Sequence, residues 1–190
     1  CSLGTSYRNK IVEPVDPYLA KEKDFSEEAF DKAAWFSSTY GGKRWGLPWD
    51  SGACAVFFNI DLFNAAGVAL PDPTQRWTWD QLLQTAQKLT TDLDGKHPGD
   101  SGFSPGRVKV FGFNTNTTWG LNRFIFGNGG EPILGNAGAP PSEHTAPYDT
   151  PEVIAGVQWL ADLAYKYRVM PDPAFTQSIP ISFASKSIAM

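Results

Sequence analysis

The sequence predicts an α/β fold, because runs that suit buried strands alternate with segments patterned as amphipathic helices. Two apolar runs, ACAVFFN at 53–59 and VKVFGFN at 108–114, do not alternate in polarity and therefore suit strands covered on both faces. A helical pattern follows each of these runs along the chain. This alternation of strand and helix, without any internal repeat, predicts the class.

The first third of the chain carries turn and capping signals. Residues 1–25 contain Pro14 and Pro17 and are expected to form loops. Residues 26–36 (SEEAFDKAAWF) predict a helix with Ser26 as its N-cap and glutamates in its first turn. The following segment, GGKRWGLPW, predicts a glycine turn that leads into a short strand.

Two helices and a polar loop come next. DLFNAAG at 61–67 predicts a short helix that ends at Gly67. Thr78 and Gln81 have capping-box spacing at the start of a second helix. The apolar stripe of that helix consists of Leu82, Leu83, Ala86 and Leu89. Residues 91–107 are rich in Gly, Pro and Asp and predict a loop.

The last third predicts a helix over 117–130, broken by glycines, and a Pro- and Gly-rich segment over 131–148. The strongest helix signal is TPEVIAGVQWLADLAYKYR, with Thr150 at the N-cap and a proline at the first position. A short helix follows, and SKSIAM at the end has the pattern of an opening strand.

Composition excludes several classes of function. Hydrophobic residues make up 42% of the 190 residues, the formal net charge is −4 and the pI is about 5.1, with a mean hydropathy of −0.28. This balance is typical of a globular domain, offers no basic face for nucleic acid, and includes no apolar run long enough to span a bilayer. Aromatic residues reach 14%, and of the seven tryptophans we expect Trp77, Trp79 and Trp159 to pack in the interior.

No pattern of catalytic or metal-ligating residues is convincing. GDSGF at 99–103 is similar to a serine-protease nucleophile loop, but His97 lies four residues from Ser101 and the chain lacks that family's many strands. Asp92 and Asp94 suggest a calcium loop that lacks its final glutamate, so a turn at Asp94-Gly95 is the better interpretation. We therefore expect no metal and no cofactor.

The two cysteines allow one internal disulfide at most. Cys54 lies within an apolar run, and we expect a buried free thiol there. Cys1 is compatible with the acylated first residue of a mature bacterial lipoprotein, which the sequence leaves open.

Four segments follow one another in a specific order and together cover most of residues 25–190. They are YGGKRWGLPWDSGACAVFFNIDLFNAAGV, WTWDQLLQTAQKLT, VFGFNTNTTWGLNRFIFGNGGE, and YDTPEVIAGVQWLADLAYKY with the terminal FASKSIAM. Together they resemble the family 1 extracellular solute-binding proteins of bacterial ABC transporters, the sugar-binding, maltose-binding-protein-like group. The first is similar to the family pattern dGKlyGlPwd…vlyYNkdLFekAGl, and the last to F.sGkaAM.

The resemblance implies the type II periplasmic-binding fold, in which two α/β lobes joined by hinge-crossing strands grip a solute between them. It implies that residues 1–48 form the end of the first lobe and a hinge strand. Residues 49–190 would form most of the second α/β lobe, with the remainder of both lobes outside this chain.

The resemblance also implies a set of ligand-binding residues. Trp49 would offer an apolar face to a sugar ring, Asp50 would accept hydrogen bonds from hydroxyls, and Ser51 would bring its backbone close to the ligand. The structural alternative is that Trp49 fills the interlobe core and Asp50 caps a turn. From the helix after the second apolar run, Trp119 would stack on the sugar, and Thr117 and Asn122 would add hydrogen bonds.

The function implied is capture of a neutral sugar or oligosaccharide outside the cell, without catalysis, and delivery to ABC permease subunits. We expect a periplasmic, extracellular or cell-surface lipoprotein location, with the membrane reached only through a lipid anchor or the permease, and no nucleic-acid partner. The alternatives are a glycoside hydrolase, which would need two facing carboxylates, and a binding protein for a non-sugar solute.

Overall fold

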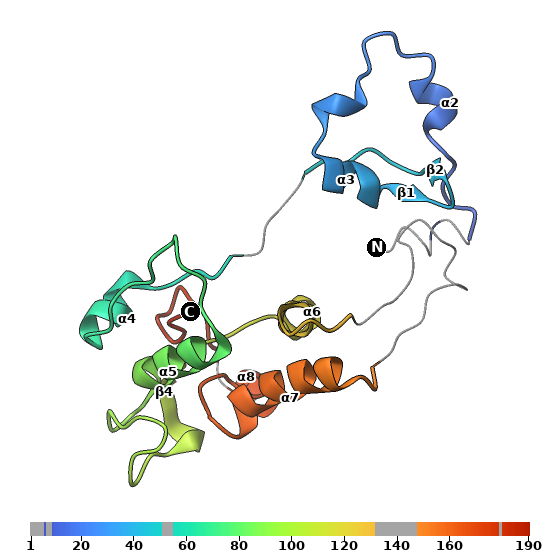
Figure 1. Ribbon diagram of the computed structural model, residues 1–190. Helices are drawn as coiled ribbons and strands as arrows, with labels where there is room; N and C mark the ends of the chain where they lie inside the picture. Colours follow the sequence, from blue (N-terminus) through green and yellow to red (C-terminus); the bar gives the residue numbers. More distant parts are fainter. Residues whose placement is uncertain (1–5, 7–8, 51–54, 132–147, 179) are drawn as a thin grey trace. The chain divides into compact units, whose positions relative to one another are not determined.

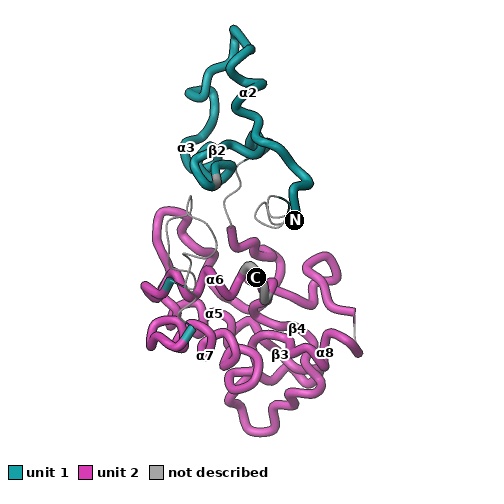
Figure 2. Tube along the Cα trace, turned by 90° about the vertical axis from the view of Figure 1, so that its right-hand side faces the viewer, with its two compact units in different colours: residues 1–54, 131–148 teal, residues 55–130, 149–190 magenta. Residues whose placement is uncertain are grey.

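The computed structural model describes residues 6, 9–50, 55–131, 148–178 and 180–190, and for Tyr40 and 117–119 it describes the backbone alone. The chain divides into two compact units, which Figures 1 and 2 show. Unit 1 consists of residues 1–54 and 131–148, and unit 2 of residues 55–130 and 149–190.

Unit 1 is built from short elements. They are α2 (Asp16–Leu19), the 3₁₀ helix η1 (Glu27–Ala29), α3 (Lys32–Ser37), β1 (Thr39–Tyr40) and β2 (Lys43–Arg44). The prediction of loop throughout 1–25 is wrong at α2, where Pro17 stands in the first turn and its fixed φ suits a helix start.

The helix predicted over 26–36 is also wrong in its extent, because it is interrupted at Asp31. The Asp31 carboxylate accepts hydrogen bonds from the backbone N–H groups of Ala33 and Ala34, both at 3.0 Å, so a new helix begins there. Ser26 does act as an N-cap, but only for η1. An aspartate that can bond to the backbone ahead of it favours a cap over a helix interior.

A hairpin and an aromatic cluster hold unit 1 together. The predicted glycine turn is confirmed: Gly41 and Gly42 have φ of 57° and 70°, and both positive values suit the tight turn that joins β1 to β2. The Arg44 guanidinium lies 3.2 Å from the centre of the Trp35 ring, which stacks on Phe30 at 5.1 Å. This cluster gives the small unit an apolar centre.

Unit 2 contains the larger core. Its elements are α4 (Ile60–Ala65), α5 (Trp79–Leu89), β3 (Thr91–Asp92), η2 (Pro105–Arg107), β4 (Val108–Val110), α6 (Thr117–Gly127), α7 (Pro151–Tyr165) and α8 (Pro173–Ser178). Strands β3 and β4 pair antiparallel. Among the described helices, none has the length and apolar character needed to cross a bilayer.

The helix ends of α4 and α5 are confirmed. The Asn59 side chain accepts from the N–H groups at the start of α4, and Gly67, with φ of 65°, follows its end. The capping box of Thr78 and Gln81 is complete, with hydrogen bonds of 3.2 Å and 2.8 Å. These caps decide where the apolar stripes begin. Of the predicted stripe of α5, Leu82, Ala86 and Leu89 are buried and Leu83 packs against the core.

Helices α5, α6 and α7 lie together within unit 2 (Figures 1 and 2). Trp79, Phe124 and Trp159 join them, since the Trp159 ring is 4.8 Å from each of the other two. Helices α6 and α7 approach each other closely at Gly156, where an added Cβ would lie 2.9 Å from the Cα of Ile125. The predicted packing role of Trp79 and Trp159 is therefore confirmed.

Three extended segments lie next to one another in unit 2. Phe111 and Ile188 form a parallel bridge, in which Ala189 N–H donates to Phe111 C=O at 2.9 Å. On the other side, Asn59 N–H donates to Ala189 C=O at 2.9 Å. Strand-like pairing at 108–114 and 187–190 is thus confirmed.

The buried strand predicted over 53–59 is wrong for its described part. Residues 55–59 are not assigned as a strand, and the Phe57 side chain is 76% exposed. Within the described residues, Asn59 alone makes a backbone hydrogen bond between this run and the other extended segments. An apolar run becomes a buried strand only when neighbours pair with it and cover it.

Candidate functional site

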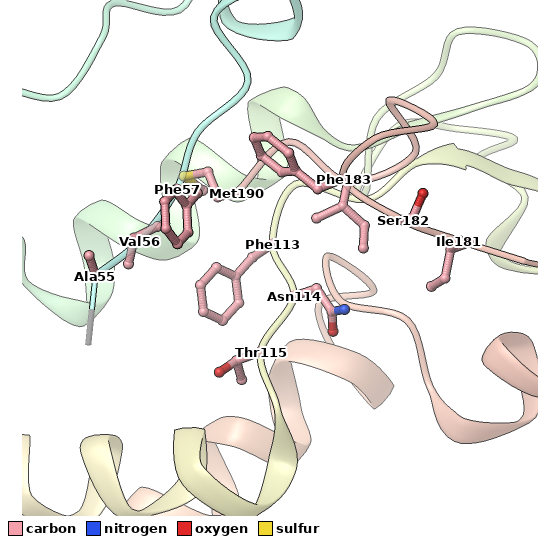
Figure 3. Close-up of a pocket in the computed structure, with 11 residues that line it drawn as sticks. Ala55, Val56, Phe57, Phe113, Asn114, Thr115, Ile181, Ser182, Phe183 and Met190 are labelled. Carbon is pink, nitrogen blue, oxygen red and sulfur yellow. The ribbon is translucent and has the colours of Figure 1, made fainter. Parts of the chain in front are cut away.

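The first hollow lies where two of the extended segments end. Segment 111–115 and segment 187–190 run parallel and present their carboxyl ends together, and the run 55–57 faces them (Figure 3). In α/β sheets, ligands bind outside the carboxyl ends of parallel strands. The hollow has a volume of about 520 Å³, within the range of small-molecule sites. It is lined by Ala55, Val56, Phe57, Phe113, Asn114, Thr115, Ile181, Ser182, Phe183, Ile188 and Met190.

Three aromatic rings line this hollow. Figure 3 shows Phe57, Phe113 and Phe183 around the same space, with Met190 beside Phe57. Phe113 is buried, whereas Phe183 is 40% exposed. The hollow thus combines a buried ring, Phe113, with a ring that solvent can reach, Phe183. Such rings offer apolar surface to a ligand.

Asn114 and Thr115 are adjacent polar residues in the lining of this hollow. The Asn114 backbone is held by its N–H, which donates to Met190 C=O at 2.9 Å. Both side chains are half-buried, and within the described part of the chain neither makes a side-chain hydrogen bond. Half-buried polar groups normally find partners, so these two are available to a ligand or to water.

A second hollow that the same two residues line lies between α6, α7 and α8. Its volume is about 560 Å³. It is lined by Asn114, Thr115, Asn116, Leu121, Val157, Leu160, Ala161, Ala164, Tyr165, Met170, Pro171, Pro173 and Thr176. Asn114 and Thr115 therefore form a wall common to both hollows.

Charge distinguishes these hollows from a third one. Among the described residues that line the first and second hollows, none carries a charge. A third hollow of about 700 Å³, between α4, α5 and the loop after β3, contains Lys88 and His97. Charged solutes need charged partners when they lose their water, so the first two hollows suit a neutral ligand.

The predicted residues of unit 1 lie at the end of its described part. The Trp49 side chain is 98% exposed, and Asp50 is exposed as well. Ser51 and Cys54 lie outside the described residues, as does Cys1. The structural alternative for Trp49 was a position in a core, and its side chain is not buried within unit 1. A role of Trp49, Asp50 and Ser51 in binding stays a prediction.

The predicted residues of unit 2 share one helix. Thr117 begins α6 and Trp119 lies in its first turn, but their side chains are outside what the structure describes. Asn122 is half-buried on α6 and lines neither of the two hollows. Their contact with a ligand also stays a prediction.

Sequence reasoning missed Asn114, Thr115, Phe57 and Phe183. A signal for the first two exists, because they directly follow an apolar run predicted as a strand, where the chain reaches the carboxyl edge of a sheet. The two phenylalanines carry no such signal, since their exposure depends on which segments cover them.

The loop after β3 is organised around the buried Asp92 carboxylate. The Asp92 side chain, only 1% exposed, accepts backbone N–H bonds from Asp94, Lys96 and Ser104, each at 2.9 Å. Burial by itself would raise the pKa of Asp92, but these three donors and the nearby Lys96 ammonium hold it below its usual value. The predicted turn at Asp94-Gly95 is confirmed, and the carboxylate oxygens are already engaged by the backbone.

His97 serves the same loop. Its Nδ1 lies 2.8 Å from the Thr90 carbonyl oxygen, and its backbone N–H donates to Asp100. The Ser101 carbonyl accepts from Lys96 Nζ at 2.6 Å. These bonds give the residues of the GDSGF motif roles in folding the loop.

Comparison with known proteins agrees with this architecture. The sequence matches the family described as "Bacterial extracellular solute-binding protein" over residues 5–178. A binding protein of Brucella abortus is 34% identical over 89 residues, which are 47% of this chain and 20% of that protein. A lipoprotein of Streptomyces antibioticus is 30% identical over 59 residues, which are 31% of this chain and 13% of that one.

Solved structures share the fold. The ABC substrate-binding protein Lmo0181 of Listeria monocytogenes, in complex with cycloalternan, has a TM-score of 0.71 at 24% identity, covering 98% of this chain and 44% of its own. A Thermotoga lettingae ABC transporter solute-binding protein bound to α-D-tagatose has a TM-score of 0.67 at 23% identity, covering 99% and 44%. UspC of Mycobacterium tuberculosis has a TM-score of 0.59 at 26% identity, covering 98% and 46%.

The chain spans about a fifth of the first curated relatives and under half of these structures. The fold is the α/β fold of periplasmic solute-binding proteins, represented here by a partial chain. The family match extends over most of the 190 residues, and the folds agree along nearly the whole chain. The chain belongs to the bacterial extracellular solute-binding proteins.

Proposed function

We propose that the whole protein is the solute-binding component of an ABC importer and that its ligand is a neutral sugar or oligosaccharide. The observation that carries the proposal is the chemistry of the first hollow, where unpartnered Asn114 and Thr115 side chains stand among aromatic walls without a charged lining residue in the described chain. Aromatic surface suits the C–H face of a sugar ring, and amide and hydroxyl groups suit its hydroxyls.

The relatives support the same ligand class. Two proteins with this fold were solved with cycloalternan and with α-D-tagatose, both carbohydrates without formal charge. The family supports an extracellular location, and one relative is named a lipoprotein. We infer delivery to permease subunits at the membrane, with closure driven by contacts that the ligand gains in the closed state.

We further propose that the protein binds its sugar without catalysis. A glycoside hydrolase needs two carboxyl groups about 5–10 Å apart across the sugar. The described lining of the two hollows contains neither Asp nor Glu. Incubation of the full-length protein with oligosaccharides should therefore release no shorter sugar, and turnover would overturn this part of the proposal.

Isothermal titration calorimetry of the full-length protein tests the ligand class. Neutral sugars should give saturable heats, whereas a polyamine, an acidic peptide and a divalent cation should not. Tight binding of a charged solute and of no sugar would refute the proposal.

The same titration tests the residues predicted from sequence. Trp49→Ala, Asp50→Ala and Trp119→Ala should each weaken sugar binding. Trp77→Ala is the control, because that half-buried ring packs against the core and lines neither hollow. Unchanged affinity in all three test variants would remove these residues from the site.

A further inference from the structure

Thr115 lines the first hollow and also packs against helix α6. Its side chain is half-buried, and within the described chain its hydroxyl makes no hydrogen bond. Figure 3 shows it on the segment that also carries Phe113 and Asn114. Because no hydrogen bond fixes this hydroxyl, its position depends on the atoms that pack against it.

Gly120 of α6 lies directly against the Thr115 side chain. A Cβ added at Gly120 would lie 2.2 Å from Thr115 Oγ1, 2.8 Å from its Cγ2 and 3.1 Å from its Cβ. Gly120 is buried, and its N–H donates to Asn116 C=O at 2.6 Å. The Thr115 side chain therefore occupies the space that a side chain at position 120 would need.

Rotation of the Thr115 side chain does not remove this conflict. Threonine has two heavy atoms on its Cβ, so each staggered rotamer leaves only one of the three positions to hydrogen. The two positions that are filled now lie 2.2 Å and 2.8 Å from the added Cβ. Every rotamer keeps a heavy atom in one of them. A side chain at position 120 would therefore have to displace the backbone as well.

Glycine is unfavourable in the first turn of α6 by itself, because in a helix it is less stable than alanine. Gly127, at the other end of the same helix, has no close neighbour, since a Cβ added there would meet open space. The contrast between the two glycines indicates that Gly120 makes room for one particular side chain, that of Thr115.

We infer that Gly120 is a positioning residue of the binding site, which keeps the Thr115 hydroxyl where it can bond to a ligand in the first hollow. The inference rests on the proposed sugar-binding function and adds a residue that does not line the hollow itself. A methyl group at position 120 displaces Thr115 and moves its hydroxyl away from the ligand. Gly120 thus determines affinity through Thr115.

The test is a double-mutant cycle in the full-length protein, measured by calorimetric titration with glucose, galactose, xylose, maltose, cellobiose and sucrose. Thr115→Ala should lower the affinity for the tightest-binding sugar of this panel by roughly fivefold, which corresponds to one lost hydrogen bond. Gly120→Ala should lower it at least as much. In the Thr115→Ala background, Gly120→Ala should have no further effect, because the two closest atoms are absent.

Gly127→Ala is the matched control, since it makes the same change in the same helix at a position with open space. It should leave the affinity unchanged in both backgrounds. Thermal unfolding gives a second readout, because Gly120→Ala should lower the melting temperature and the double variant should recover it. If Gly120→Ala by itself does not fold, the double variant should still fold and bind as Thr115→Ala does.

The outcomes separate the two proposals. If no sugar of the panel binds to the wild type, the proposed function itself is refuted. The positioning role is overturned, and sugar binding stands, if a sugar binds but Thr115→Ala or Gly120→Ala keeps full affinity. It is also overturned if Gly120→Ala costs the same affinity with and without the threonine side chain, or if the double variant does not fold.

Discussion

The backbone N–H of Asn114 donates to the carbonyl oxygen of Met190 at 2.9 Å, while the Asn114 side-chain amide makes no hydrogen bond within the described chain. The main chain of the residue is thus held in place and its side chain is left available. Binding sites need this combination, because a group whose position is already fixed loses little freedom when a ligand arrives.

Asn114→Ala should lower sugar affinity by roughly tenfold, because one good hydrogen bond to the ligand is worth about 1 kcal/mol and the wall also loses its shape. The melting temperature should stay within about 1 °C, since the amide makes no hydrogen bond to any residue that the structure describes. Calorimetry and thermal unfolding measure the two effects. Asn64→Ala, at an exposed position of α4, is the control, and an equal loss of affinity there would contradict the assignment.

Gly156→Ala should destabilise unit 2 by up to roughly 2 kcal/mol. Alanine gains about 1 kcal/mol in helix propensity, but the added methyl would lie about 3 Å from Ile125 atoms on α6, and overpacking costs roughly 1–3 kcal/mol. Urea unfolding measures the difference. Gly127→Ala, where the added Cβ would meet open space, should be neutral or stabilising. The close approach of α6 and α7 is refuted if both variants behave alike.

Lys186→Gly should make the protein more stable than Lys186→Ala by about 1 kcal/mol. Lys186 has φ of 58° at the position where the family pattern F.sGkaAM has its glycine, and glycine alone adopts this conformation without cost. Both variants lose the exposed ion pair of Lys186 Nζ with Asp61 Oδ2 at 2.6 Å, so their difference isolates the backbone. Thermal unfolding of the two variants measures this difference, and equal midpoints would exclude backbone strain at Lys186.

Asp92 should make stability depend on acid pH. Its pKa is lowered in the folded state, so the ionised form stabilises the fold above the unfolded-state pKa of about 3.9. This stabilisation is lost as the pH falls through the folded-state pKa. Thermal unfolding at pH 7, 5 and 3 should therefore show a lower midpoint for Asp92→Asn than for wild type at pH 7, and a smaller drop on acidification.

Asp94→Asn is the control for Asp92. Asp94 is exposed and pairs with Arg107 at 3.3 Å on the surface, where ion pairs contribute little. The variant should follow the wild-type pH profile. If Asp92→Asn also kept that profile, the buried carboxylate would not organise the loop.

The starts and ends of several helices could be predicted from the amino-acid sequence. The caps at Asn59 and Thr78, and Gly67 after α4, depend on groups within a few residues of each other, so local bonding is enough to specify them. The same local signal at Asp31 divides a helix predicted as continuous, because the aspartate competes as a new cap. The α/β class and the order of the family motifs were likewise readable from the chain.

Which side chains are buried and which are exposed depends on contacts between segments that are distant in the sequence, so it could not be predicted locally. The apolar run that includes Phe57 reads as a buried strand, yet its state depends on pairing with distant segments, and the ring is exposed. Asp92 reads as a polar loop residue, yet backbone donors from across the loop make its burial favourable. The two hollows that Asn114 lines arise from segments that meet only after folding, because burial and cavity shape are properties of the packing and not of any one stretch of residues.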